Sequence, residues 1–310
     1  MSEAVYDVLI IGGGPAGLTA GLYASRAKLR TLLVERMIMG GQVMTTTKVE
    51  NYPGFPGGID GPDLMLRFQE HCQEFGLEVR YGEVSGLVDA GGEKVVTVDG
   101  EPVRARTAIV TTGAEPRKLG IPGEPELTGR GVSYCATCDG AFFRNVPVAV
   151  VGGGDTAAEE ALFLTRFASR VYLIHRRGEL RATKVLQERL AANEKVEILW
   201  HRTVERALGE SSGLKAVQLR DTVSGEPSEL AVEGLFVAIG VTPKAHFLAE
   251  VLTLDADGHI LTDAECRTSM PGVFAAGDVR KKILKQIATA VGDGAVAAIM
   301  AEKYLEDLEG

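Results

Sequence analysis

Cysteine is scarce in this chain, which has only four cysteines among its 310 residues. Small secreted domains that depend on disulfides are much richer in cysteine, so a disulfide scaffold is not indicated. Positive charge is also in the minority, with 33 lysines and arginines against 42 aspartates and glutamates and a net charge of −9. A nucleic-acid-binding protein would more often carry a basic field, so nucleic acid is not an expected partner.

Long apolar runs are missing as well. No run approaches the roughly 20 residues that a helix needs to cross a bilayer, so no membrane partner is expected. The first ten residues, MSEAVYDVLI, lack the basic segment and the cleavage site of a secretory signal, and we therefore expect a cytoplasmic protein. The length allows about two domains, and 45% hydrophobic with 24% charged residues is typical of a globular protein.

Glycine, in contrast, is abundant, and two glycine-rich turns belong to an internal repeat. DVLIIGGGPAGLTAGLYASRAKLRTLLVE (7–35) and PVAVVGGGDTAAEEALFLTRFASRVYLIH (147–175) align without a gap. Each copy has a short apolar run, three glycines, a helical stretch rich in alanine and leucine, and a second apolar run. This order predicts a strand, a helix and a parallel strand in both copies.

The glycines have the spacing of a dinucleotide-binding turn. The first copy reads G-x-G-x-x-G from residue 12, and the second reads G-x-G-x-x-A from residue 152. The first glycine permits a tight turn, the second lets a pyrophosphate approach the backbone, and the third position must be small so that helix and strand pack closely. The alternative interpretation is that both glycine turns bind no ligand. The strand–helix–strand context, which occurs twice, favours nucleotide binding instead.

The two copies end differently. The first ends in Glu35, an acid that can accept hydrogen bonds from ribose hydroxyls. The second ends in His175, Arg176 and Arg177, with Arg181 following. Cations at this position favour a 2′-phosphate and hence NADP over NAD, although an HRR segment alone could be a solvated basic edge.

Further elements are predicted around the repeat. Residues 63–75 read as an amphipathic helix with Leu64, Leu66, Phe68, Cys72 and Phe75 as apolar contacts. Residues 78–98 and 196–232 show short alternating runs that are typical of small antiparallel sheets. Residues 294–308 read as a helix packed on the core.

Two of the cysteines lie in SYCATCDG (133–140), separated by two residues. A zinc site needs four ligands, whereas Cys72 and Cys266 each stand alone and the histidines form no cluster, so no metal site is predicted. A disulfide across so short a loop removes only about 2 kcal/mol of unfolded-state freedom, which argues against a structural staple. The pattern therefore favours an exchanging dithiol.

The ordered set of motifs resembles that of the low-molecular-weight thioredoxin reductases over nearly the whole chain. The matching motifs are GGGPAG (12–17), GGQV (40–43), ENYPGFP (50–56), TTGAEPR (111–117), CATCDG (135–140), VVGGGDTAAEEA (150–161), HRR (175–177), GLFVAIGVTP (234–243) and PGVFAAGDV (271–279).

The resemblance implies an α/β fold with two Rossmann-like, three-layer nucleotide-binding domains, one inserted into the other. It implies a discontinuous FAD-binding domain at 1–115 and 246–310. It also implies an NADPH-binding domain at 116–245 that carries the CxxC dithiol. The family is usually homodimeric, and its domains rotate against each other about hinges near Pro116 and Lys244.

The resemblance also assigns the contacts of the two cofactors. Those of FAD are Gly12, Gly14, Ala16, Gly17, Glu35, Gln42, Asn51, Gly277, Asp278 and Gln286. Those of NADPH are Gly154, Asp155, Thr156, His175, Arg176, Arg177 and Arg181.

The implied reaction passes hydride from NADPH to the flavin, which then opens the Cys135–Cys138 disulfide. Cys138 is the sulfur that faces the flavin, and Cys135 attacks the disulfide of thioredoxin as a thiolate. Asp139 could supply or accept the proton. As the residue before Gly140, it could equally be a turn residue, and the two roles are compatible.

One stretch departs from the family pattern. Between Gly277-Asp278 and Gln286 the family often has an acid, an aromatic and an arginine, whereas this chain has a basic run at 280–282 and Lys285. Lysine can meet a phosphate but loses the bidentate geometry of arginine. Two alternative functions remain open at this point. They are a reductase of another thiol protein, such as a peroxidase partner or a glutaredoxin-like carrier, and a non-catalytic flavin redox sensor.

Overall fold

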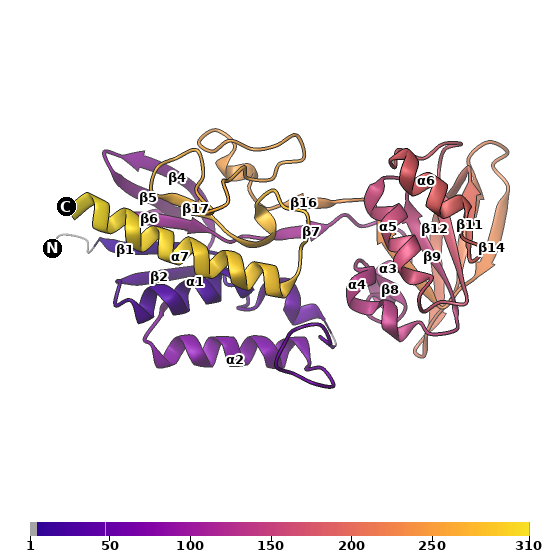
Figure 1. The fold of residues 1–310 in the computed structure, drawn as a ribbon, viewed down its shortest axis with the longest axis horizontal. Coiled ribbons are helices and arrows are strands. Elements are labelled where there is room, and N and C mark those ends of the chain that lie inside the picture. Colours follow the sequence, from indigo (N-terminus) through magenta and orange to yellow (C-terminus); the bar gives the residue numbers. More distant parts are fainter. Residues whose placement is uncertain (1–4, 47, 310) are drawn as a thin grey trace. The chain divides into compact units, whose positions relative to one another are not determined.

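The computed structural model describes residues 5–46 and 48–309 of the chain. The chain divides into two compact units: unit 1 is Met1–Glu115 with Thr242–Gly310, and unit 2 is Pro116–Val241. Unit 1 is therefore built from both ends of the chain, and unit 2 from its middle (Figure 1). Two short strands, β7 (Ala114–Pro116) and β16 (Val241–Pro243), pair with each other where the chain passes between the units.

Unit 1 contains a seven-stranded sheet with the order β3-β2-β1-β6-β5-β4, and β17 also pairs with β6. The pairs among β1, β2, β3, β6 and β17 are parallel, whereas β4–β5 and β5–β6 are antiparallel. The strands are β1 (Tyr6–Ile11), β2 (Thr31–Glu35), β3 (Glu78–Tyr81), β4 (Val84–Ala90), β5 (Glu93–Val98), β6 (Glu101–Val110) and β17 (Val273–Ala275).

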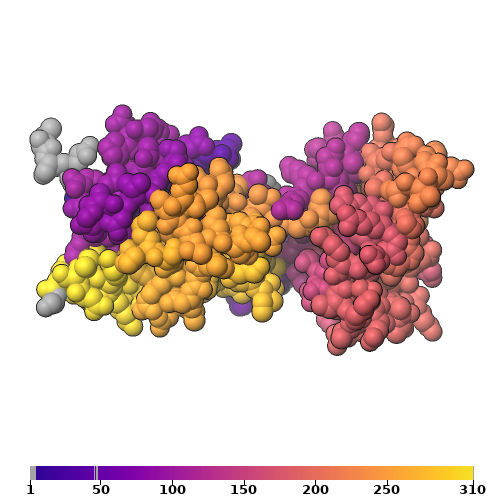
Figure 2. All heavy atoms as spheres, turned by 90° about the horizontal axis from the view of Figure 1, so that it is seen from above, coloured from indigo at the N-terminus to yellow at the C-terminus, as the bar shows by residue number. Residues whose placement is uncertain are grey.

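Three helices complete unit 1, and they come from opposite ends of the chain. They are α1 (Pro15–Arg26), α2 (Gly61–Glu74) and α7 (Ile287–Glu309), with 3₁₀ turns η1 (Gly41–Thr45), η3 (His246–Leu248) and η4 (Gly277–Val279). Helix α7 lies along α1 (Figure 1), close enough that a Cβ on Gly294 would lie 2.3 Å from the Ala16 carbonyl oxygen. The surface of this unit likewise shows early and late segments of the chain side by side (Figure 2).

The sheet of unit 1 is buried on both faces. Val8 and Ile10 of β1 pack in a cluster with residues of α1, α2 and α7. Leu9 and Ile11, which point to the other face, pack with β4–β6 and with residues from 245 to 279. A continuous apolar strand is expected where a parallel sheet is covered on both sides.

Unit 2 has a five-stranded sheet of order β11-β10-β9-β15-β8, in which all pairs are parallel. A three-stranded antiparallel sheet, β12-β13-β14, accompanies it. Its strands are β8 (Val132–Ser133), β9 (Pro147–Gly152), β10 (Arg170–His175), β11 (Val196–Trp200), β12 (Arg202–Glu210), β13 (Gly213–Asp221), β14 (Pro227–Ala231) and β15 (Gly234–Ala238). Its helices are α3 (Glu124–Leu127), α4 (Ala136–Asp139), α5 (Asp155–Leu164) and α6 (Lys184–Ala191), with the 3₁₀ turn η2 (Gly140–Phe142).

Three layers are also present in unit 2. Val148 and Val150 of β9 pack in a cluster with residues of α5 and α6. Ala149 and Val151 pack on the other face with residues of the antiparallel sheet. The predicted α/β class with two three-layer nucleotide-binding folds is confirmed.

The two sheets share one topology, which extends the repeat beyond its two copies in the sequence. The order β3-β2-β1-β6 in unit 1 corresponds to β11-β10-β9-β15 in unit 2. The prediction of purely antiparallel sheets at 78–98 and 196–232 is therefore wrong for their first strands, since β3 pairs parallel with β2 and β11 with β10. Each follows a helix, α2 or α6, and a helical crossover returns the chain parallel to the preceding strand.

The predicted helix at 63–75 is confirmed as α2, but two of its predicted apolar contacts are wrong. Leu64 and Cys72 are buried, whereas Leu66 is 53% and Phe75 38% exposed. Leu66 lies about 200° around the helix from Leu64, and so faces away from the sheet. The C-terminal helix is confirmed and begins earlier, at Ile287. Within residues 5–46 and 48–309, no helix combines the length and apolar character that a bilayer crossing requires.

Candidate active site

The two cysteines of the CxxC motif lie at the start of the short helix α4. Cys135 is the residue before the helix, Cys138 lies within it, and the two form a disulfide with a Cα–Cα distance of 5.3 Å. Both residues are partly buried. The sulfurs are therefore joined, as a dithiol in its oxidised state requires, and they lie in unit 2.

Asp139, which follows Cys138, accepts a hydrogen bond from the buried hydroxyl of Ser133. The Ser133 Oγ lies 2.7 Å from Asp139 Oδ2 and also accepts the Cys135 N–H at 3.1 Å. Burial raises the pKa of Asp139, and the Ser133 hydrogen bond opposes that shift. A carboxyl with a raised pKa beside a disulfide is better suited to hold and release a proton than an ordinary aspartate.

A second carboxyl, Glu160 of α5, borders the same helix. Its Oε1 accepts the Ala136 N–H at 3.4 Å, and among the described residues its buried Oε2 has no hydrogen-bond partner. Burial raises the pKa of Glu160 to about 7, with the Ala136 N–H acting in the opposite direction. The sequence analysis missed Glu160, because nothing in its local pattern distinguishes it from an exposed acid such as Glu159.

The raised pKa of Glu160 predicts a specific pH dependence of stability. The folded carboxyl keeps its proton up to about pH 7, whereas the unfolded one loses it near 4.5. The unfolded state then binds fewer protons, so this group lowers the free energy of unfolding as pH rises from about 4.5 to 7. Glu160→Gln should remove that loss, gaining at most about 3 kcal/mol over the wild type across this window.

Urea unfolding of both proteins at several pH values measures the difference. Glu159→Gln is the matched control, because Glu159 is an exposed neighbour on α5. A gap between Glu160→Gln and wild type that stays constant from pH 4.5 to 7.5 would contradict the assigned pKa.

The first glycine turn has the geometry of a dinucleotide cradle. Gly12 has φ +108°, and a Cβ on Gly17 would lie only 1.9 Å from the Gly12 carbonyl oxygen. A Cβ on Gly14, in contrast, would meet nothing within 4 Å, because this glycine faces open space at the start of α1. Gly12 and Gly17 thus allow the tight turn and the close packing of the helix, whereas Gly14 leaves room for a ligand to approach the backbone.

The other residues predicted for this site line up along unit 1. Glu35 accepts the Gly13 N–H at 2.7 Å and the Met37 N–H at 3.0 Å. A Cβ on Gly41 would lie 3.3 Å from the Gly14 Cα, so η1, which carries Gln42, reaches the glycine turn. The Asn51 amide donates to the Gln286 side-chain oxygen at 2.9 Å.

Gly277 and Asp278 complete this group. A Cβ on Gly277 would lie 3.0 Å from that of Ala16, which places η4 against α1. Among the residues that the structure describes, the buried Asp278 Oδ1 has no hydrogen-bond partner, and burial raises the pKa of Asp278. The same oxygen lies 3.7 Å from Lys282 Nζ, which partly compensates its charge. A buried carboxylate oxygen without a hydrogen bond, beside an open glycine turn, fits a ligand that offers hydroxyl donors.

The second glycine turn, in unit 2, has a similar construction. A Cβ on Gly152 would lie 2.5 Å from that of Ala157, whereas a Cβ on Gly154 would meet nothing within 4 Å. The carboxylate of Asp155 accepts the Thr183 N–H at 2.6 Å, and the Arg181 N–H donates to the Gly153 carbonyl at 2.7 Å. These bonds tie the segment after β10 to the glycine turn.

His175 lies against this turn. Its Nδ1 donates to the Gly152 carbonyl at 2.8 Å, and a Cβ on Gly153 would clash with the ring at 2.2 Å. The ring is buried, and its Nε2 has no hydrogen-bond partner within the described part of the chain. The structure therefore gives His175 a supporting position under the backbone of the turn, and a contact with a bound nucleotide stays a prediction.

The three predicted phosphate ligands, Arg176, Arg177 and Arg181, are exposed. Among residues 5–46 and 48–309, no carboxylate forms an ion pair with any of them. Hydrogen bonds hold the backbone of this segment, since Thr222 Oγ1 donates to the Arg176 carbonyl and the His201 N–H to the Arg177 carbonyl. Uncompensated guanidinium groups near an open glycine turn fit a phosphorylated ribose. Thr156 is also exposed, at the start of α5.

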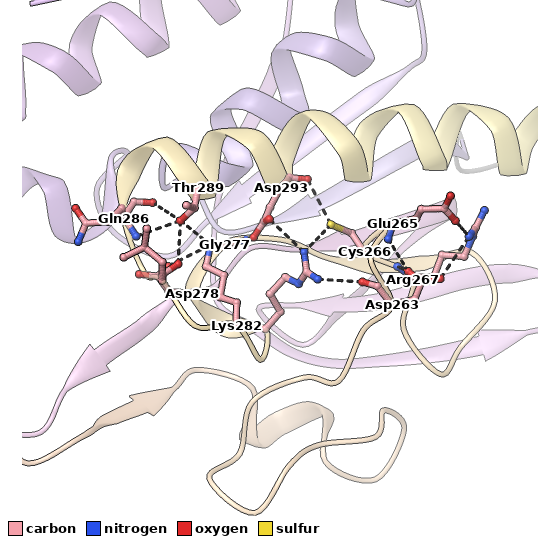
Figure 3. Close-up of polar contacts among 12 residues, drawn as sticks. Asp263, Glu265, Cys266, Arg267, Gly277, Asp278, Lys282, Gln286, Thr289 and Asp293 are labelled. Atoms are coloured by element: carbon pink, nitrogen blue, oxygen red, sulfur yellow. Dashed lines mark hydrogen bonds and ion pairs between the residues drawn. The ribbon is translucent and has the colours of Figure 1, made fainter. Parts of the chain in front are cut away.

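The basic run at 280–282 is neutralised within unit 1. Figure 3 shows the part of this network that contains Lys282 and Asp293. Asp293 of α7 pairs with Lys282 Nζ at 2.9 Å and with Arg280 at 3.1 Å, and it also accepts the Gly277 N–H at 3.0 Å. Lys281 pairs with Asp255 at 2.9 Å. Burial lowers the pKa of Lys285, against the opposing effect of Asp278. The run thus fastens η4 to α7.

Sequence reasoning did not identify Asp293, although a lone acid in the otherwise small and apolar stretch AVGDGAVAA is a usable signal. The two remaining cysteines are buried, and burial raises the pKa of Cys72 to about 12 and that of Cys266 to about 11. Such thiols are poor nucleophiles at neutral pH.

Comparisons with known proteins agree with this geometry. The family model of the pyridine nucleotide-disulphide oxidoreductases matches residues 6–294. The chain is 50% identical over 307 residues to a thioredoxin reductase of Listeria innocua, covering 99% of this chain and 96% of that protein. It is 48% identical over 307 residues to the thioredoxin reductase of Bacillus subtilis, covering 99% and 97%.

A solved structure is also similar. The crystal structure of thioredoxin reductase from Streptococcus pyogenes superposes with a TM-score of 0.94 at 45% identity, covering 99% of this chain and 100% of that one. The chain belongs to the pyridine nucleotide-disulphide oxidoreductase family and, within it, to the low-molecular-weight thioredoxin reductases.

Proposed function

We propose that this chain is an NADPH-dependent flavoprotein that reduces the disulfide of thioredoxin through FAD and the Cys135–Cys138 pair. The observation that carries this conclusion is the Cys135–Cys138 disulfide in a chain about half identical, over its full length, to thioredoxin reductases. The chain is thus an enzyme of the thioredoxin-disulfide reductase class.

Unit 1 is the proposed FAD-binding unit. Its turn would hold the pyrophosphate at Gly12 and Gly14, with Ala16 and Gly17 keeping the helix close. Glu35 would accept hydrogen bonds from the ribose hydroxyls, since each of its carboxylate oxygens has a lone pair beyond the one that accepts a backbone N–H. The remaining proposed contacts are Gln42, Asn51, Gly277, Asp278 and Gln286.

Unit 2 is the proposed NADPH-binding unit. Its pyrophosphate site is the open backbone at Gly154, Asp155 and Thr156. The preference for NADPH rests on Arg176, Arg177 and Arg181, whose guanidinium groups have no carboxylate partner among the described residues. His175 would stabilise the glycine turn through its hydrogen bond to the Gly152 carbonyl.

Bound FAD would supply a two-electron relay between the nicotinamide and the disulfide. The chain's own residues then act on sulfur and protons. Cys135, as a thiolate, attacks the thioredoxin disulfide, and Cys138 resolves the mixed disulfide and restores the Cys135–Cys138 bond. Asp139 holds the proton that the leaving thiolate takes, which its raised pKa favours.

The proposal extends to assembly and location. We expect a homodimer, as the family resemblance implies, and we place the reaction in the cytoplasm, where thiols are kept reduced. Light scattering of the purified protein would measure the dimer directly.

One assay tests the function. Oxidation of NADPH by the purified flavoprotein should be slow alone and fast once the organism's own thioredoxin is added in its disulfide form. Turnover with a glutaredoxin-like carrier or a peroxidase partner, but not with thioredoxin, would select the other reductase function. Flavin reduction without turnover on any thiol protein would select the redox sensor.

The glycine geometry predicts that two alanine variants fail in different ways. Gly17→Ala should lower the free energy of unfolding by more than about 2 kcal/mol, because its Cβ cannot fit 1.9 Å from the Gly12 oxygen. Gly14→Ala should leave the stability of the FAD-free protein within about 0.5 kcal/mol, since its Cβ meets no protein atom within 4 Å. It should nevertheless weaken FAD binding.

Urea unfolding without FAD and titration with FAD measure these two effects. Tight FAD binding by Gly14→Ala would contradict the proposal that the FAD pyrophosphate binds at this turn.

A further inference from the structure

Ser133 is the last residue of β8, two positions before the first cysteine, and is 4% exposed. Its hydroxyl contacts both sides of the reactive loop. It donates to Asp139 Oδ2 at 2.7 Å and accepts the Cys135 N–H at 3.1 Å. A third group, the Cys135 carbonyl oxygen, lies 3.4 Å from the same Oγ.

These three contacts suit two protonation states of Asp139. A hydroxyl has one hydrogen, so it can serve only one of the two acceptors, the Asp139 carboxylate or the Cys135 carbonyl. When Asp139 is ionised, the hydrogen of Ser133 points to the carboxylate. When Asp139 is protonated, the acid can donate to Ser133 Oγ, and the hydroxyl hydrogen can turn to the Cys135 carbonyl. Each state keeps its polar atoms paired.

We propose that Ser133 is a positioning residue of the disulfide exchange, whose hydroxyl holds the Asp139 carboxyl against the Cys135 backbone and turns between two acceptors as Asp139 gains and loses its proton. This inference rests on the proposed function, in which Asp139 supplies a proton. It adds that the proton donor depends on a hydroxyl outside the CxxC motif.

The exchange balances with this assignment. The reduced enzyme holds a Cys135 thiolate, a Cys138 thiol and a protonated Asp139. Attack by Cys135 breaks the substrate S–S bond, forms a mixed disulfide, and leaves a substrate thiolate that takes the Asp139 proton. Cys138 then attacks Cys135, breaks the mixed disulfide, and gives its proton to the second substrate sulfur. The enzyme pair is oxidised by two electrons, the substrate gains two thiols, and Ser133 turns back to the ionised carboxylate.

The titration of Asp139 must be distinguished from that of the other ionisable groups near this loop. Glu160 approaches from α5 through the Ala136 N–H at 3.4 Å. Tyr134, the residue between Ser133 and Cys135, donates to Glu124 at 2.9 Å. Burial raises the pKa of Asp139 and the Ser133 hydrogen bond lowers it, so loss of the hydroxyl should raise that pKa further.

The test is the pH profile of kcat/KM for thioredoxin with the FAD-loaded enzyme, between pH 5.5 and 9.5. Ser133→Ala should shift the alkaline limb to higher pH, because activity needs protonated Asp139 and its pKa rises. Ser133→Thr and Ser133→Val form a matched pair with and without the hydroxyl. The alkaline limb of Ser133→Thr should lie at the same pH as that of the wild type, and the limb of Ser133→Val should shift as that of Ser133→Ala does. If the same variants shift the limb equally in a Glu160→Gln background, the shift does not come from the titration of Glu160.

Asp139→Asn distinguishes the possible failures. If it abolishes the limb while Ser133→Ala and Ser133→Val leave the limb in place, the positioning role is wrong and the proposed function stands. If Asp139→Asn retains the alkaline limb, Asp139 is not the proton donor. The role of Asp139 as proton donor and the role of Ser133 as its positioning residue are then both wrong. Flavin absorbance per chain reports whether each variant folds and binds FAD. If Ser133→Ala does not bind FAD, the comparison of Ser133→Thr with Ser133→Val tests the role of the hydroxyl.

Discussion

Cys138→Ser is expected to reduce thioredoxin turnover by at least about a thousandfold, while NADPH still bleaches the bound flavin. The Cys135–Cys138 bond is the only disulfide within the described residues, and the other two cysteines are buried with raised pKa values. No other described sulfur can therefore replace Cys138 as the partner of Cys135. Serine keeps the shape of the side chain and removes only the chemistry.

Two measurements on one preparation test this expectation: flavin bleaching by NADPH without thioredoxin, and NADPH oxidation with it. Cys72→Ala is the control, since it changes a cysteine of unit 1 and leaves the CxxC pair intact. Persistent thioredoxin turnover in Cys138→Ser would remove this residue from the mechanism.

The second large effect concerns the choice between NADPH and NADH. Wild-type enzyme should be reduced far faster by NADPH at low nucleotide concentration. Arg176→Ala combined with Arg177→Ala should cost about 2–4 kcal/mol of NADPH binding, or roughly 30- to 1,000-fold, because charge-assisted hydrogen bonds to the 2′-phosphate are lost. NADH, which lacks that phosphate, should react with the variant as with wild type.

Stopped-flow bleaching of the flavin across a range of nucleotide concentrations measures both reactions. Arg189→Ala is a suitable control, because Arg189 is an exposed arginine on α6 of the same unit. Arg181→Ala should give a smaller loss of the same kind. Comparable rates with NADPH and NADH in the wild type would overturn the assignment of these arginines.

Much of the fold was predictable because its signals are local. The two glycine turns follow apolar runs and precede alanine-rich helices, and both proved to be strand–turn–helix–strand units whose two strands pair in parallel. The direction of β3 and β11 was predicted wrongly. An exposed, alternating strand reads the same whether it pairs parallel or antiparallel, and only the helix before it fixes the direction.

The class of chemistry could be predicted from local residue patterns, which are a dithiol motif, two glycine turns with dinucleotide spacing, and arginines at the position expected for a 2′-phosphate. These depend on residue types at short spacings, which the chain order records. Which groups surround the reactive loop depends on the folded chain, which brings the Ser133 hydroxyl and the Glu160 carboxyl there. The folded chain also turned the basic run at 280–282 into an internal network around Asp293. Burial and hydrogen bonding depend on segments far apart in the sequence, so only folding sets the charge state of such groups.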